Sequence, residues 1–152
     1  MTRTLLFVVT GALLACSGHK QTEQTQRADS TAVTYEQVAA ESAAVNDQLK
    51  NAVVAINRQC PVQIDAGTRL DSAQAVSQTE LQYNYTLTAL TRAEVDVARL
   101  EATTKPMLIE SVRTNPALTN LRDHSITMTY RYRDRNGEQV MRLSVLPGDY
   151  AP

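Results

Sequence analysis

The chain has 152 residues, of which 43% are hydrophobic and 20% are charged, and its formal net charge is -1. This length fits one domain, and the composition excludes a wholly disordered chain, a disulfide-dense mini-protein and a polytopic membrane protein. Because 15 Lys and Arg residues are balanced by 16 Asp and Glu residues, no strong positive field exists, and we expect no nucleic-acid partner.

The first residues have the anatomy of a secretory signal. Arg3 is followed by an apolar run from Leu5 to Leu14, which is too short to span a hydrocarbon core of about 30 Å. A positive start, a short apolar run and a small residue before the cleavage site are typical of a signal peptide. We therefore expect residues 1–15 to form a signal peptide.

The tetrapeptide Leu13-Leu14-Ala15-Cys16 resembles the lipobox of bacterial lipoproteins. The resemblance implies transfer of diacylglycerol to the Cys16 sulfur, cleavage before Cys16 and acylation, for instance by palmitate, of the new amino terminus. Two or more acyl chains hold a protein stably on a membrane. In Gram-negative bacteria, Ser17 would then favour the periplasmic face of the outer membrane. The alternative is an ordinary secretory signal with a cysteine nearby by chance.

The chain divides into a tether and a folded part after the cleavage site. Residues 17–33 are polar and show no helical or alternating apolar pattern, so with the lipidated Cys16 they are expected to form a flexible tether, residues 16–33. Residues 34–152 have a common domain length and are long enough to bury a core. We expect them to form a single domain.

The folded part is predicted to begin with a helix. Thr34 to Gln37 match a capping box, and apolar or small residues then recur every three or four positions up to Cys60. This spacing is typical of an amphipathic helix. Pro61 disfavours helical geometry at the residue before it, so the helix should end near Gln59.

Two or three strands should follow, and then a second helix. Residues 62–64 alternate between apolar and polar side chains, residues 70–76 suggest a weaker strand, and residues 81–87 show the period of two that is typical of a half-buried strand. A second capping-box pattern at residues 91–94 predicts the start of the next helix, which should end at Asn115-Pro116.

The last segment predicts a β-hairpin. Apolar and polar residues alternate on both sides of Asn136-Gly137, which is the favoured pair for a two-residue loop. A slip of one residue would place an apolar row in water, so the turn and the pattern agree on one register. That register sets three apolar residues opposite three others: Tyr132 opposite Met141, Tyr130 opposite Leu143, and Met128 opposite Val145.

The order of elements predicts the α+β class. A helix, two or three strands, a second helix and a hairpin favour an antiparallel sheet of four to five strands. Two main helices should pack on one face of this sheet, and the C-terminal β-hairpin should complete it.

Few residues could carry chemistry. Once Cys16 is lipidated, Cys60 is the remaining thiol, and a buried small hydrophobe is the favoured interpretation over an intermolecular disulfide or a reactive thiol. His124 could act as a general base with Asp123 or Glu110, although a surface histidine is the commoner case. The folded part has one His, which excludes a two-His metal motif, so we expect no metal and no cofactor.

Arginines gather on the outer face of the predicted hairpin. Arg131, Arg133 and Arg142 project to one side, and Arg135 lies near the turn. In the predicted register Arg131 faces Arg142, and like charges directly opposite each other are unfavourable. An anionic partner would relieve this repulsion, which makes these four arginines candidates for partner binding. The alternatives are a solvated sheet face and edge arginines that discourage aggregation.

Several short motifs resemble a loosely defined set of uncharacterised bacterial envelope proteins. They are residues 57–61, the two Tyr-x-Tyr strands and residues 133–137, and the resemblance spans roughly residues 45–146. In that set a second cysteine often follows the second helix, where this chain has Arg113 and Thr114, which puts a disulfide carried over from it in doubt. The resemblance implies no particular activity.

These observations predict a lipid-anchored periplasmic binding or assembly protein of the bacterial cell envelope that is not an enzyme. Its expected partners are the membrane, through the lipid, and an envelope protein. One alternative is a pilotin-like or structural accessory lipoprotein of a secretion or envelope machine. A weaker alternative is a hydrolase that uses His124.

Overall fold

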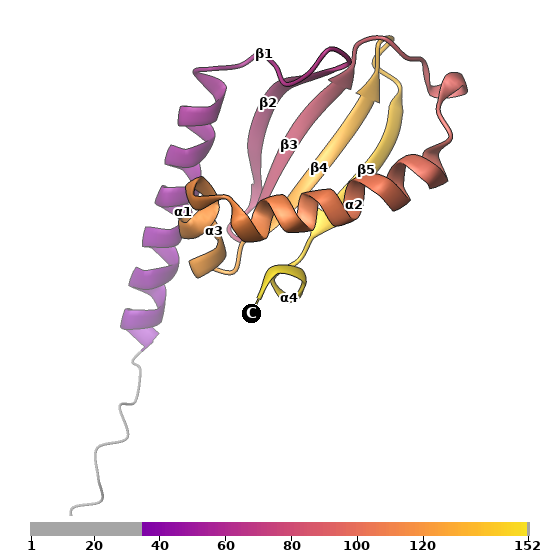
Figure 1. Cartoon of the computed structure of the whole chain (residues 1–152). Helices are drawn as coiled ribbons and strands as arrows, with labels where there is room; N and C mark the ends of the chain where they lie inside the picture. Colours follow the sequence, from indigo (N-terminus) through magenta and orange to yellow (C-terminus); the bar gives the residue numbers. More distant parts are fainter. Residues whose placement is uncertain (1–34, 152) are drawn as a thin grey trace, which may run out of the picture. The chain divides into compact units, whose positions relative to one another are not determined.

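The computed structural model describes residues 35–151 (Figure 1). The expected signal peptide, Cys16, the tether and the helix cap at Thr34 lie outside the described residues. Along the described chain the elements are α1 (Tyr35–Asn57), β1 (Val62–Gln63), β2 (Thr68–Ser77), β3 (Glu80–Leu87), η1 (Arg92–Glu94), α2 (Val97–Thr114), η2 (Pro116–Leu118), α3 (Thr119–Asp123), β4 (Thr127–Asp134), β5 (Gln139–Val145) and α4 (Pro147–Tyr150). None of the described helices is long and apolar enough to cross a membrane.

The five strands form one mixed sheet in the order β1-β2-β3-β4-β5, which confirms the α+β class and the number of strands. The expectation of a purely antiparallel sheet is wrong at one interface, because β3 and β4 pair in parallel. The chain between them crosses through α2, so β4 runs in the same direction as β3. Such a crossover is what a parallel pair requires, whereas a tight turn joins only antiparallel strands.

Both main helices pack against the sheet through a few buried side chains. Helix α1 contacts β2, and α2 contacts β5 (Figure 1). Leu49 on α1 and Val112 on α2 are 1% and 0% exposed, as the three-and-four spacing of apolar residues predicts. The strands complete the core with Leu70, Ala73, Leu81, Tyr83, Leu87, Met128, Tyr130, Tyr132, Met141, Leu143 and Val145.

The sequence predicts the helix limits only in part. Helix α1 ends at Asn57, two residues before the predicted end. The predicted cap at Thr91 exists, because the carboxylate of Glu94 accepts hydrogen bonds from the amide and the hydroxyl of Thr91. This cap lies at the start of the short η1 and not at the start of α2. Helix α2 begins later, where Asp96 accepts a hydrogen bond from the amide of Arg99 at 3.1 Å. Asp is a favoured N-cap residue, but the capping-box pattern at residues 91–94 led to the prediction of an earlier helix start.

The predicted hairpin register is confirmed, but its loop is longer than predicted. Met128, Tyr130 and Tyr132 face their predicted partners across β4 and β5. The loop is not two residues long, because the amide of Asp134 bonds to the carbonyl of Glu138. The carboxylate of Asp134 accepts hydrogen bonds from the amides of Asn136 and Glu138, both at 2.8 Å. This favours a three-residue loop that ends on a left-handed glycine.

Gly137 is that glycine, and replacing it with Val should destabilise the hairpin. Its φ is +85°, which a β-branched residue adopts only with strain. A Cβ atom there would have no heavy atom within 4 Å, so the cost comes from the backbone alone, about 1–2 kcal/mol. Urea denaturation should report this loss for Gly137→Val and a smaller one for Gly137→Asn. Equal stability of the Val variant and the wild type would contradict the prediction.

Candidate binding groove

Four tyrosines form a stacked cluster, which we call the tyrosine cluster, in the middle of the sheet. The parallel register sets Tyr83 beside Tyr130 and Tyr85 beside Tyr132. The ring centroids of these pairs lie 5.3 and 5.1 Å apart, with angles of 19° and 16° between the ring planes. The tilted Tyr83–Tyr85 pair joins the two stacks at 6.4 Å. Such pairs add roughly 0.5–1.5 kcal/mol each beyond the apolar area they bury.

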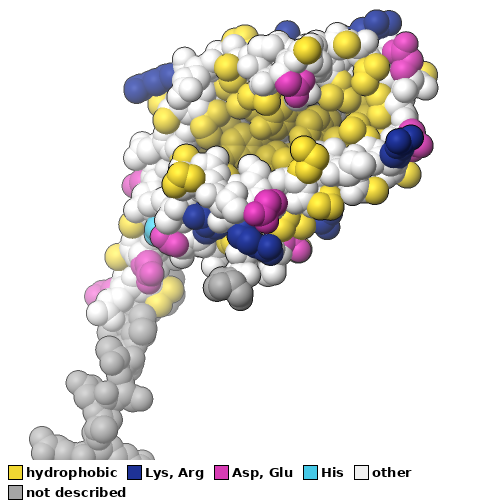
Figure 2. All heavy atoms as spheres, viewed as in Figure 1, with side chains coloured by type: hydrophobic (Ala, Val, Ile, Leu, Met, Phe, Trp, Pro, Cys, Tyr) yellow, Lys and Arg dark blue, Asp and Glu magenta, His cyan; other side chains and the backbone are white. Residues whose placement is uncertain are grey.

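A groove of about 510 Å³ opens above the tyrosine cluster. Helix α2 forms one wall, and the loop after β1 with the start of β2 forms the other. Figure 2 shows this region as a broad hollow lined by hydrophobic side chains. The lining residues are Ile64, Asp65, Thr68, Tyr83, Tyr85, Leu87, Leu100, Thr104, Met107, Leu108, Ser111, Asn115, Leu118, Tyr130, Tyr132 and Met141.

The tyrosine hydroxyls are the polar groups on the floor of the groove. Within residues 35–151 none of the four hydroxyls makes a hydrogen bond through its oxygen to another protein group. None of these oxygens is fully buried, so each is open to solvent. Burial raises the pKa of Tyr83 to about 12. Burial, aided by the charge of Asp65, raises the pKa of Tyr132 to about 12 as well. The hydroxyls therefore stay neutral at physiological pH and can donate or accept hydrogen bonds in the groove.

Exposed apolar side chains stand on both walls of the groove. Met107 on α2 is 71% exposed and Ile64 after β1 is 55% exposed. Met is flexible and polarisable and is overused at surfaces that adapt to their ligands. An apolar lining with a few polar groups is typical of a binding site.

Two of the four candidate arginines are engaged with neighbours in the sheet. Arg131 does face Arg142, on the face opposite the tyrosine cluster. Arg142 forms an ion pair with Glu80 of β3, with 2.8 Å between Nη2 and Oε1, and Arg131 donates a hydrogen bond to Gln139 at 3.2 Å. Glu80 therefore supplies the negative charge that the sequence alone left to a partner.

The other two arginines lie farther toward the hairpin loop. Arg133 is exposed near the end of β4, and Arg135 is exposed within the loop. The amide of Arg135 bonds to the carbonyl of Leu90 at 3.0 Å, which ties the loop to the segment before η1. Partner binding through the four arginines stays a prediction.

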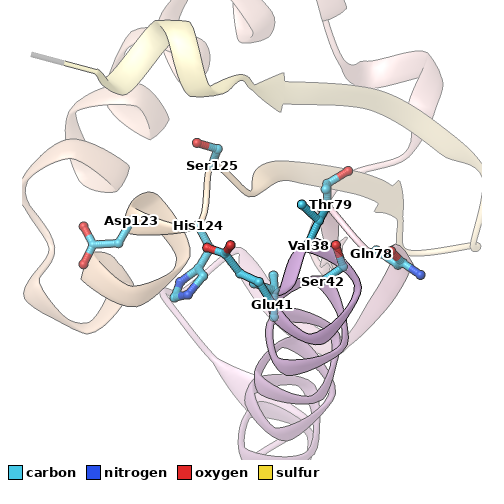
Figure 3. Close-up of a pocket in the computed structure, with 9 residues that line it drawn as sticks. Val38, Glu41, Ser42, Gln78, Thr79, Asp123, His124 and Ser125 are labelled. Atoms are coloured by element: carbon cyan, nitrogen blue, oxygen red, sulfur yellow. The ribbon is translucent and has the colours of Figure 1, made fainter. Parts of the chain in front are cut away.

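His124 lies in a separate pocket of about 310 Å³ between the exposed start of α1 and the turn after α3. Its Nδ1 donates a hydrogen bond to the carbonyl of Asn120 at 2.7 Å. Figure 3 shows that the side chains of Asp123 and Ser125 point away from the imidazole. Neither of these two side chains is therefore placed to act with the imidazole as a nucleophile–base pair.

Cys60 is a free, half-buried thiol that packs against the core. Burial, with a smaller effect of the charge of Asp71, raises its pKa, so the unreactive thiol form is favoured. Among residues 35–151 no group of three or more His, Cys, Asp or Glu side chains could hold a metal ion.

The sequence did not predict the groove. The Tyr-x-Tyr pattern in both strands was visible and marked the buried face correctly, but it did not show that the two strands would be neighbours. The opening between α2 and the loop after β1 left no sequence signal, because it depends on two segments about forty residues apart in the chain.

One family model matches most of the described chain. Residues 43–141 match the model of a family described as a domain of unknown function (DUF8479). No curated protein sequence is significantly similar to the chain.

Solved structures with a similar fold include two pilotins. EpsS, the pilotin from the Vibrio vulnificus type 2 secretion system, has a TM-score of 0.60 at 10% identity and covers 75% of this chain and 98% of its own. AspS, the type II secretion system pilotin from Vibrio cholerae, has a TM-score of 0.57 at 11% identity, over 74% of this chain and 97% of its own. A Pseudomonas aeruginosa protein described as secreted has a TM-score of 0.60 at 14% identity, over 73% and 96%.

Proposed function

The chain belongs to the family of the DUF8479 domain, and we propose that it is a pilotin-like accessory protein of a bacterial envelope machine. In this proposal it is not an enzyme, and it acts by binding an apolar segment of a partner protein in the groove above the tyrosine cluster. The sequence predicts either a general binding module or an accessory protein. The likeness in fold to two pilotins favours the accessory role.

The groove is the single observation that carries this proposal. It joins a floor of aromatic rings to walls with exposed Met107 and Ile64, and large exposed apolar patches mark interaction sites. Helical partner segments commonly lay an apolar face into such grooves, with anchors every three or four residues. The tyrosine hydroxyls would then meet the polar groups of the segment.

A photo-crosslinking amino acid at Met107 tests the proposal in living cells. Because Met107 is exposed and lines the groove, its replacement should leave folding intact and yield one main adduct with an envelope protein. Lys105 is the matched control on the same helix, since it does not line the groove. A third site at Arg131 tests the arginine face.

The three sites separate the two candidate surfaces. We expect an adduct from Met107 that mass spectrometry identifies as an envelope component, and none from Lys105 or Arg131. An adduct from Arg131 alone would move the interaction to the polar sheet face and refute the groove as the binding site.

We further propose that Cys16 anchors the protein by its lipid to the periplasmic face of the outer membrane. The lipobox-like tetrapeptide before it supports this part of the proposal. Cys16→Ser should abolish labelling by radioactive palmitate and move the protein from the membrane fraction to the soluble periplasm, or leave a precursor that is not processed. Unchanged palmitate labelling of the variant would exclude lipidation at this residue.

A further inference from the structure

The groove contains one charged side chain. Among its lining residues Asp65 is the only Asp, Glu, Lys, Arg or His. One carboxylate oxygen, Oδ1, accepts a hydrogen bond from the amide of Gly67 at 2.8 Å. In the described part of the chain no Lys or Arg forms an ion pair with Asp65, so its charge is not neutralised from within.

Asp65 shares the groove with the hydroxyls of the tyrosine cluster. Asp65 and Tyr132 line the same groove, and the charge of Asp65 contributes to the raised pKa of Tyr132. Tyr83, Tyr130 and Tyr132 are more than nine-tenths buried, yet their hydroxyls make no hydrogen bond within residues 35–151. These hydroxyls are not fully buried, so a ligand that covers them must itself supply hydrogen-bond partners, or they would be left unsatisfied.

The charge decides which class of ligand fits. A fatty acid or a phospholipid headgroup would bring negative charge toward Asp65, and no Lys or Arg in the lining offsets that repulsion. A hydrocarbon chain would also leave the tyrosine hydroxyls without partners. A peptide brings apolar side chains, backbone carbonyls and amides, and it can place one cation beside Asp65.

We infer that the groove selects an apolar peptide segment whose single Lys or Arg side chain faces Asp65, while the tyrosine hydroxyls bond to polar groups of the same segment. This inference rests on the proposed function and adds to it the chemistry of the partner. An exposed ion pair of this kind changes affinity by no more than about fivefold, so Asp65 sets selectivity more than total affinity.

Selection from a random 16-residue peptide library displayed on phage tests the inference with the full chain as bait. The key variant is Asp65→Asn, whose side-chain oxygen can still accept the hydrogen bond from Gly67 and which lacks only the charge. Asp65→Lys reverses the charge. Asp47→Asn is the matched control, because Asp47 is an exposed acid on α1 that does not line the groove.

We expect the wild type and Asp47→Asn to enrich apolar peptides with Lys or Arg at one fixed position. Asp65→Asn should enrich apolar peptides without that preference, and Asp65→Lys should favour Asp or Glu there. For a selected peptide, replacing its cation with Gln should weaken binding to the wild type about two- to fivefold and leave binding to Asp65→Asn unchanged.

Two results would overturn the inference, and they differ in their consequence for the proposed function. Apolar peptides enriched by the wild type without a fixed cation would refute the role of Asp65 and leave the proposed function intact. Failure of the wild type to enrich any apolar peptide would refute both.

Discussion

Replacing Tyr130 with Ala is expected to lower the free energy of unfolding by about 3–5 kcal/mol, which is the usual cost of removing a large buried aromatic side chain. Tyr130 is 5% exposed, and its ring stacks on Tyr83 at 5.3 Å and lies 6.4 Å from Tyr85. The variant loses these contacts and leaves a cavity beneath the groove. Chemical denaturation measures the loss directly.

Tyr130→Phe separates packing from hydrogen bonding. Its ring can keep every stacking contact, and the missing hydroxyl has no side-chain hydrogen bond within the described residues. We therefore expect a change in stability of less than about 1 kcal/mol, together with weaker binding of a peptide in the groove. If Tyr130→Phe destabilised the protein as much as Tyr130→Ala, the hydroxyl would stabilise the fold, and the prediction would be wrong.

Raising the pH above 10 should destabilise the protein steeply. An unfolded chain ionises its tyrosines near pH 10, whereas burial raises the pKa of Tyr83 to about 12 and that of Tyr132 to about 12. Burial raises the pKa values of Tyr85 and Tyr130 as well. The cluster thus holds protons that the unfolded chain has released.

The sign follows from this difference in bound protons. Below pH 10 both states are protonated, and the tyrosines add no pH dependence. Above pH 10 the unfolded state binds fewer protons, so the free energy of unfolding falls by about 1.4 kcal/mol per pH unit for each tyrosine affected. For Tyr83 and Tyr132 the fall continues to about pH 12, where the folded forms ionise as well.

Urea denaturation at pH 9, 10, 11 and 12, with tyrosine ionisation followed by absorbance, checks this prediction. The double variant Tyr83→Phe/Tyr132→Phe is the control, because it removes two of the groups and should make the decline shallower. A decline of the same slope in both proteins would assign the alkaline instability to groups outside the tyrosine cluster.

The hairpin illustrates what local patterns predict well. Alternation in β4 and β5 identified the buried face, and a slip of one residue would have exposed an apolar row. Tyr130 and Tyr132 accordingly meet their predicted partners. The loop length was wrong because the carboxylate of Asp134 organises the turn through backbone amides. The Asn136-Gly137 pair, which suggested a shorter turn, did not reveal that contribution.

The direction of β4 beside β3 illustrates the opposite case. A period of two marks a strand and its buried face, and it says nothing of which strand lies alongside. The same holds for Arg142, whose ion pair with Glu80 crosses from β5 to β3. The sequence could show that Arg131 and Arg142 face each other, but not that an acid from a distant strand would lie within 2.8 Å of one of them.

The sequence by itself predicts two helices, a set of half-buried strands and a C-terminal hairpin with one register. Each of these features can be predicted because it depends on residues close together in the chain. The tertiary structure alone decided that the two Tyr-x-Tyr strands lie side by side in parallel and that a groove opens above them. Both outcomes depend on how α2 carries the chain across the sheet, and hence on packing between segments far apart in sequence. Local periodicity contains no information about that packing.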